Sequence, residues 1–229
     1  MDKISYLQQN ETLPNSSNWD NMCGAYCLSY YLIKSKKLSY LGDKTEGEII
    51  LGTNKTNARN FVSETYNGNN NFKGVRLGEN NKKVISDYSC PIKIKNYLAN
   101  FYGITNAMLY YDKEKGSRTT LENEDMQNLF SDVITDISVL PNENWYIIAL
   151  LNHNVKDENN ANNKSNYEAC HYVLLVKDGD NLTIIDPLVA HEQNVPNFKQ
   201  FLSGKDDNAR FTSGSINYKF LRAGVYIPF

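Results

Sequence analysis

Two cysteines lie four positions apart in the stretch NWDNMCGAYCLSYYL, where a polar, Asn-rich segment becomes almost continuously apolar. Cys23 falls at this change and is followed by Gly24, whereas Cys27 comes one helical turn later. A thiol becomes a strong nucleophile when its thiolate is favoured, as it is at a helix N-terminus or beside an imidazolium. The start of a predicted helix at Cys23, and the room that Gly24 leaves for a substrate, favour Cys23 as a nucleophile.

A nucleophilic cysteine needs a base, and the chain contains three histidines, His153, His171 and His191. His171 opens the apolar run HYVLLVK, which favours a strand, whereas the other two have polar neighbours typical of solvated loops. Beyond an Asp-Gly-Asp turn signal, the run NLTIID ends in Asp186. In an antiparallel hairpin with this turn, residues 171 and 186 are almost direct partners. The spacing therefore predicts a histidine and an orienting carboxylate at one end of a sheet.

The order of these residues resembles that of papain-like cysteine peptidases, and most closely their bacteriocin-processing (C39-like) branch. The resemblance depends on the runs CGAYCL and HYVLL and on an Asp-Pro pair, and it covers about residues 18–33 and 145–190. It implies that Cys23 is the nucleophile, that His171 is the base and that Asp186 orients the imidazole.

The same family places a glutamine six residues before the nucleophile, where its side-chain amide helps to stabilise the oxyanion. This chain has Ser17 at that position and so departs from the pattern. Asn18, one residue later, is our candidate for the missing amide, and Asn15 and Asn21 are alternatives. An oxyanion donor typically contributes about 100-fold or more to the rate, so its identity matters.

The remaining cysteines have simpler interpretations. Cys27, Cys90 and Cys170 are expected to be buried thiols or plain surface residues. The main alternative makes Cys27 the nucleophile, because Asn21 then lies six residues upstream. A zinc site formed by the cysteines and His171 is disfavoured, because the spacing is unusual and consecutive strand residues point to opposite faces. We expect neither a metal nor a cofactor.

The patterns along the chain predict an α+β fold. Helical spacing or capping is seen over residues 25–33, 89–103, 119–137 and 197–202, and short β-branched or aromatic runs over 145–151, 171–177, 181–186 and 223–229. Residues 40–84 are expected to form surface loops around short elements. Helices followed by an antiparallel sheet are typical of the α+β class. We predict a single papain-like catalytic domain over 1–229, with a helical lobe of about 1–140, a sheet lobe of about 141–229 and an active cleft between them.

The composition limits the partners. The formal net charge is -2 and 22% of the residues are charged, so no global attraction to nucleic acid or to an anionic membrane is expected. No apolar run approaches the roughly 18 residues of a membrane span, and the first residues lack a signal-peptide pattern. We expect a protein or peptide substrate, and either a cytoplasmic location or export by a route without such a signal.

These observations predict a thiol hydrolase that cleaves peptide bonds through a thioester, and an Asn-rich chain of this kind resembles a bacterial secreted effector or toxin. Attack on a glutamine side chain would instead make the protein a deamidase or transglutaminase toxin. A third hypothesis is a non-catalytic binding module that retains the fold.

Overall fold

A computed structural model describes residues 23–35, 74–77, 83–86, 91–111, 134–135, 140–155, 167–203, 210–213 and 216–229. The helices are α1 (Cys23–Lys34), α4 (Pro91–Tyr102) and α7 (Phe198–Ser203). The strands are β1 (Gly74–Leu77), β2 (Lys83–Ser86), β3 (Met108–Tyr111), β4 (Ile134–Thr135), β5 (Trp145–Val155), β6 (Tyr167–Asp178), β7 (Asn181–Ile185), β8 (Glu192–Asn194), β9 (Arg210–Ser213) and β10 (Ile216–Pro228). This mixture of helices and antiparallel strands confirms the predicted α+β class.

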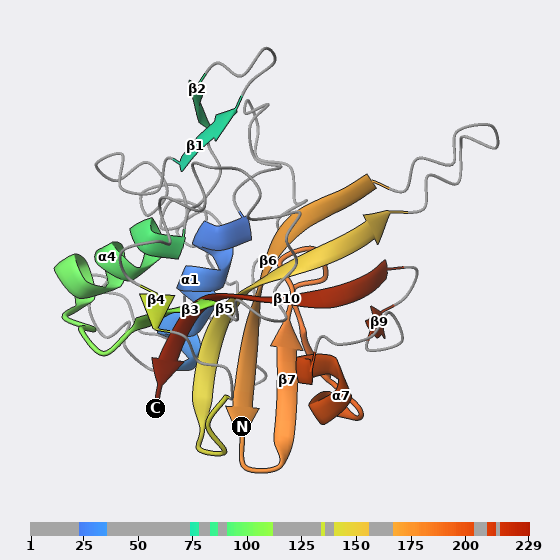
Figure 1. Ribbon diagram of the computed structural model, residues 1–229. Coiled ribbons are helices and arrows are strands. Elements are labelled where there is room, and N and C mark those ends of the chain that lie inside the picture. The colour runs from blue at the N-terminus through green and yellow to red at the C-terminus, as the bar shows by residue number, and fades with distance from the viewer. Residues whose placement is uncertain are drawn as a thin grey trace, which may run out of the picture.

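Within the described residues, the main sheet has eight strands in the order β4-β3-β10-β5-β6-β7-β8, with β9 paired to β10. Neighbouring strands are antiparallel except for β3 and β4, which are parallel. The long strands β5, β6 and β10 run through the middle of this sheet (Figure 1). β1 and β2 form a separate two-stranded sheet.

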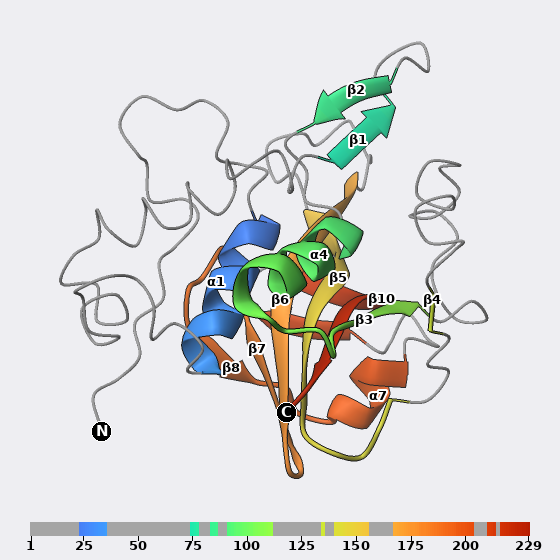
Figure 2. The ribbon, with the colours of Figure 1, turned by 90° about the vertical axis from the view of Figure 1, so that its left-hand side faces the viewer.

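Apolar side chains cover both faces of the sheet. Alternate residues of a strand point to opposite faces, so Ile148 and Leu150 of β5 pack in the cluster that contains α1 and α4. Ile147 and Leu151 pack in the second cluster, which contains Phe201 of α7. Figure 2 shows α1 and α4 in front of the sheet, and Figure 1 shows α7 on its opposite side. Burial of both faces explains why the central strands are almost continuously apolar.

The first helix, α1, is buried around most of its circumference. Leu28 and Leu32 are fully buried, and the Ser29 hydroxyl satisfies its hydrogen-bonding capacity by donating to the Tyr26 carbonyl at 2.7 Å. Lys34 marks the exposed end, where its Nζ lies 2.7 Å from Glu192 Oε1. The predicted helix over 25–33 is confirmed. Neither α1 nor another helix in the described part of the chain is long and apolar enough to cross a membrane.

β10 contains an irregularity that bends the strand. Its register with β5 shifts between Phe220 and Gly224, and Arg222 within this bulge has a φ of 56°. Gly224 has a φ of 152°, and a Cβ there would lie 2.2 Å from the Ile148 carbonyl oxygen. The close approach of the two backbones therefore requires glycine at this position.

Most of the predicted elements are confirmed. The helices expected at 89–103 and 197–202 correspond to α4 and α7, and the four expected strands correspond to β5, β6, β7 and β10, although β7 and β10 each end one residue earlier than expected. α4 ends where expected, because the Gly103 N–H binds the Ala99 carbonyl at 3.2 Å and Gly103 has a φ of 65°. In the segment expected to be loops around short elements, β1 and the start of β2 are the described elements.

Two predictions about the middle of the chain differ from the structure. The helix expected over 119–137 is wrong at its end, because Ile134 and Thr135 form β4 beside β3, and the part before it lies outside the described residues. Consecutive β-branched residues at 133–135 favour a strand there. β3 itself lies between β4 and β10, so the sheet extends across the predicted lobe boundary near residue 140.

Candidate active site

The hairpin of β6 and β7 brings His171 and Asp186 together. Its register pairs Leu174 with Ile185, and the turn contains Gly179 with a φ of 57°. Continuing this register would place residue 186 level with residue 173, two positions from His171, so the two residues are less directly paired than predicted. The two side chains still share one face and one end of the hairpin, because 171 and 173 have the same parity.

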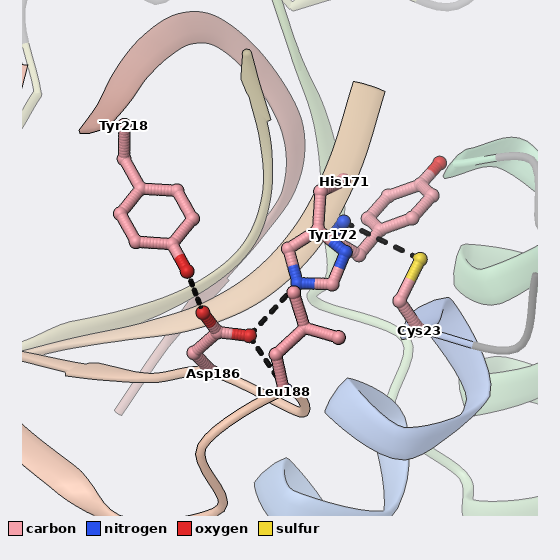
Figure 3. Close-up of polar contacts among 6 residues, drawn as sticks. All are labelled: Cys23, His171, Tyr172, Asp186, Leu188 and Tyr218. Carbon is pink, nitrogen blue, oxygen red and sulfur yellow. Dashed lines mark hydrogen bonds and ion pairs between the residues drawn. The ribbon is translucent and has the colours of Figure 1, made fainter. Parts of the chain in front are cut away.

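The Asp186 carboxylate is the centre of a buried hydrogen-bond network. His171 Nε2 lies 2.8 Å from Asp186 Oδ1, and the Leu188 N–H donates to the same oxygen at 2.8 Å. The Tyr218 hydroxyl donates to Oδ2. An ionised carboxylate can only accept hydrogen bonds, so Nε2 carries a proton and the other ring nitrogen, Nδ1, is left to act on a substrate or thiol. Figure 3 shows the three contacts around the carboxylate.

Cys23, the first residue of α1, lies on the other side of the imidazole. The Tyr172 backbone N–H donates to Cys23 Sγ at 3.5 Å, and Figure 3 shows the His171 ring between this sulfur and the Asp186 carboxylate. The β6–β7 ladder ends at Ile185, so β7 does not pair with Tyr172. The N-terminus of α1 can therefore reach the edge of β6. There Cys23, from the helices on one face of the sheet, lies close to His171, whose side chain comes from the other face.

The interactions within this group determine its charges. Burial lowers the pKa of His171, but the hydrogen bonds to Asp186 and Cys23 and their negative charges outweigh burial and raise it to about 10. Burial raises the pKa of Asp186, but the hydrogen bond and charge of His171, with the Tyr218 and Leu188 donors, bring it below its ordinary value. The pair is therefore an imidazolium and a carboxylate at neutral pH.

The two cysteines of α1 have different environments. Cys27 is 0% exposed, and burial, followed by the negative charges of Cys23 and Asp186, raises its pKa well above the usual value for a thiol. The burial of Cys27 agrees with the expectation of a buried thiol. Cys23 is 8% exposed and is the thiol that contacts the strand carrying His171. The geometry favours Cys23 over the alternative nucleophile.

Other residues considered for the site are placed elsewhere or lie outside the described residues. The latter include the oxyanion candidate Asn18 and also Asn15, Ser17, Asn21 and Cys90. His153 and Cys170 belong to β5 and β6, where their backbones alone are described. His191 is exposed, as expected, and donates from Nδ1 to the Val189 carbonyl at 2.8 Å. Over the described ranges, three or more His, Cys, Asp or Glu side chains are nowhere grouped as metal ligands.

Neither the Tyr218 hydroxyl nor the backbone donors of Tyr172 and Leu188 stand out in the sequence as parts of a site. The alternation of Tyr218 and Phe220 with Asn217 and Lys219 is a signal for a strand. It could have extended the predicted last strand toward residue 216. A contact between this strand and Asp186 depends on the order of strands in the sheet, which the local pattern does not specify.

Two cavities formed by described residues lie away from these side chains. One, of about 470 Å³, is lined by residues that include Tyr31, Tyr102 and Phe229, near the C-terminal end of α1. The other, of about 590 Å³, lies around residues 194–200. Neither is lined by the residues of the Asp186 network, so the predicted active cleft remains a prediction.

Comparison of the chain with known protein families, with curated proteins and with solved structures finds no match.

Proposed function

We propose that this chain is a papain-like thiol hydrolase that acts on amide bonds of proteins or peptides, with Cys23 as nucleophile, His171 as base and acid, and Asp186 as the orienting carboxylate. The observation that carries this proposal is the buried 2.8 Å contact between His171 Nε2 and Asp186 Oδ1, with the Cys23 sulfur on the other side of the same ring. A nucleophile, a base and an orienter in this order are the minimum set for thiol catalysis.

The acylation step follows from the charges. Sγ of Cys23, as a thiolate, attacks the amide carbon and forms a carbon–sulfur bond, while the carbonyl π electrons move to oxygen. When the tetrahedral intermediate collapses, the carbon–nitrogen bond breaks and the imidazolium of His171 donates its Nδ1 proton to the leaving amine. Nε2–H remains hydrogen-bonded to Asp186, which keeps the ring in one orientation.

The deacylation step reverses the roles. Neutral His171 takes a proton from water at Nδ1 as the water oxygen attacks the thioester carbon. The carbon–sulfur bond then breaks, which releases a carboxylic acid product and restores the thiolate of Cys23 beside the imidazolium. The buried Asp186 carboxylate, which is 2% exposed, stabilises the imidazolium in both half-reactions.

The oxyanion needs donors, and α1 supplies part of them. The first backbone N–H groups of a helix have no partners within the helix, and they carry partial positive charge. Because α1 begins at Cys23, its own N–H is one proposed donor. The side-chain amide of Asn18 is the proposed second donor, five residues upstream.

The proposal is tested by labelling and mass spectrometry of the native protein. A chloroacetamide or iodoacetamide probe should label Cys23 in preference to Cys27, and labelling should decrease in His171→Ala. An unlabelled Cys23 in the folded protein would contradict both enzyme hypotheses. The hypothesis of a non-catalytic binding module would then remain.

Incubation with a mixture of proteins, followed by peptide-level mass spectrometry, identifies the reaction. New termini that depend on Cys23 support a peptidase, which is the outcome we expect. A mass increase of about one dalton at glutamine, without new termini, would instead establish the deamidase alternative. The Cys27→Ala variant is the matched control, because it removes a thiol one turn away on the same helix.

A further inference from the structure

A tyrosine from a distant strand completes the network around Asp186. Tyr218 lies on β10, and its hydroxyl donates to Asp186 Oδ2, the oxygen that His171 does not use. The ring is 0% exposed, so water cannot replace this donor. The hydroxyl therefore makes the third hydrogen bond to a carboxylate that is itself almost completely buried.

The position of Tyr218 is fixed by the sheet on both sides. Its backbone pairs with His153 of β5 and with Phe211 of β9. The ring also stacks on Phe211, with centroids 6.3 Å apart and an interplanar angle of 20°. A hydroxyl held this way cannot follow the carboxylate if the carboxylate rotates, so it defines one orientation of the Asp186 side chain.

The two oxygens of the Asp186 carboxylate therefore have different hydrogen-bond donors. Oδ1 accepts from His171 and from the Leu188 N–H, and Oδ2 accepts from the hydroxyl on β10. If Oδ2 lost its donor, a buried anion would have an unsatisfied acceptor, which favours protonation or rotation of the group. Either change would weaken the hold on the imidazole.

We infer that Tyr218 is a positioning residue of the proposed active site: its hydroxyl fixes the Asp186 carboxylate in the orientation and charge state in which Oδ1 holds His171 Nε2–H. The inference concerns the His171–Asp186 pair and rests on the proposed function only for its effect on rate. Tyr218 does not touch the substrate in this scheme and acts through Asp186.

The test compares Tyr218→Phe with Tyr110→Phe. Tyr110 is also fully buried, belongs to the same apolar cluster and lies on β3, so it controls for the general effect of removing a buried hydroxyl. NMR titration of the Asp186 carboxyl carbon, assigned by its loss in Asp186→Asn, reports the charge state. The His171 Nε2–H proton resonance reports the hydrogen bond.

In Tyr218→Phe we expect the Asp186 titration to move to higher pH by about one unit, the size of effect typical of one hydrogen bond to a charged group. The Nε2–H resonance should shift or broaden, and kcat should fall about 10-fold or more with little change in KM. Tyr110→Phe should leave the titration and the resonance unchanged. An unchanged titration and Nε2–H resonance in folded Tyr218→Phe would overturn the inference.

A second measurement covers the case in which Tyr218→Phe does not fold. In the wild-type protein, the Tyr218 hydroxyl proton should give a slowly exchanging downfield resonance that moves in Asp186→Asn, where the side chain presents an NH₂ group to the hydroxyl. A resonance that does not respond would overturn the inference. If the wild-type protein hydrolyses no amide, the proposed function fails, but both NMR readouts still decide the role of Tyr218.

Discussion

Asp186 holds the His171 imidazole at 2.8 Å although the two residues are not opposite partners in the hairpin that carries them. The ladder ends at the Leu174–Ile185 pair, and the chain turns away at the proline that follows Asp186. Because the β6–β7 ladder ends there, the Asp186 carboxylate lies beside the His171 ring. The edge of β6 beyond this point is also left open to α1. One local feature of the hairpin therefore produces both contacts of the imidazole.

The first prediction concerns the charge of this pair. Asp186→Asn keeps an oxygen that can accept from His171 Nε2–H but removes the negative charge. Because the hydrogen bond and charge of Asp186 help to raise the pKa of His171 while burial lowers it, we expect this pKa to fall below the value of about 10 in the wild type. The ring then loses its proton at a lower pH than in the wild type, and kcat/KM should decrease by about 100-fold or more. NMR titration of the imidazole and a pH profile of kcat/KM measure the two effects.

The direction of the pH profile distinguishes this account from a general loss of structure. If the imidazolium is required, the alkaline limb of kcat/KM should move to lower pH in Asp186→Asn, together with the titration of His171. An alkaline limb that stays at the wild-type pH, while the ring titrates lower, would show that the charge of His171 does not control the rate.

The second prediction is the effect of pH on stability. His171 has a folded-state pKa raised from 6.5 to about 10, so its contribution is fully present below pH 6.5 and is lost as the pH rises toward 10. We expect the free energy of unfolding to fall by a few kcal/mol over this range, on the order of what such a shift implies. Urea denaturation at several pH values measures it. The decline should be smaller in His171→Asn, and an equal decline in both proteins would contradict the assignment.

The sequence indicated three candidate residues that the structure brings close together. Cys23, His171 and Asp186 were identifiable because each lies at the boundary of a strongly patterned element: the start of an apolar helix, the start of an apolar strand, and the end of a strand before proline. Such boundaries depend on local patterns that a single sequence contains. Their mutual distances depend on only one turn and one helix–sheet contact.

The parts that were missed depend on tertiary pairing. Apolar residues recur at helical spacing around Ile134 and Thr135 and predict a helix, but pairing with β3 makes these two residues a strand. The contact between Tyr218 and Asp186 depends on the order of the strands, in which β5 and β6 lie between β10 and β7. The hydrophobic periodicity of a single segment does not predict the order of strands in the sheet.

The third prediction separates the two cysteines of α1. Cys23→Ala should reduce kcat by at least about 1,000-fold with little loss of stability, because it removes the nucleophile at the edge of the core. Cys27→Ala should retain most activity but lower the free energy of unfolding by about 1–2 kcal/mol, since it leaves a small cavity at a fully buried position. Single-turnover kinetics and chemical denaturation measure the two effects. Activity retained in Cys23→Ala would disprove the assignment of the nucleophile.

The fourth prediction concerns the bulge in β10 that separates Tyr218 from the second half of the strand. In Gly224→Ala the new Cβ would lie 2.2 Å from the Ile148 carbonyl oxygen, at a φ of 152° that residues with side chains rarely adopt. Because the obstacle is backbone and cannot rotate away, we expect a loss of at least about 3 kcal/mol, measured by urea denaturation. Gly103→Ala is the matched control, since the φ of Gly103 is 65° but nothing lies within 4 Å of the added carbon. This substitution should lower the free energy of unfolding by only about 1 kcal/mol, from backbone strain alone. Equal losses in the two variants would show that the close contact between β10 and β5 does not control stability, and that the bulge can move.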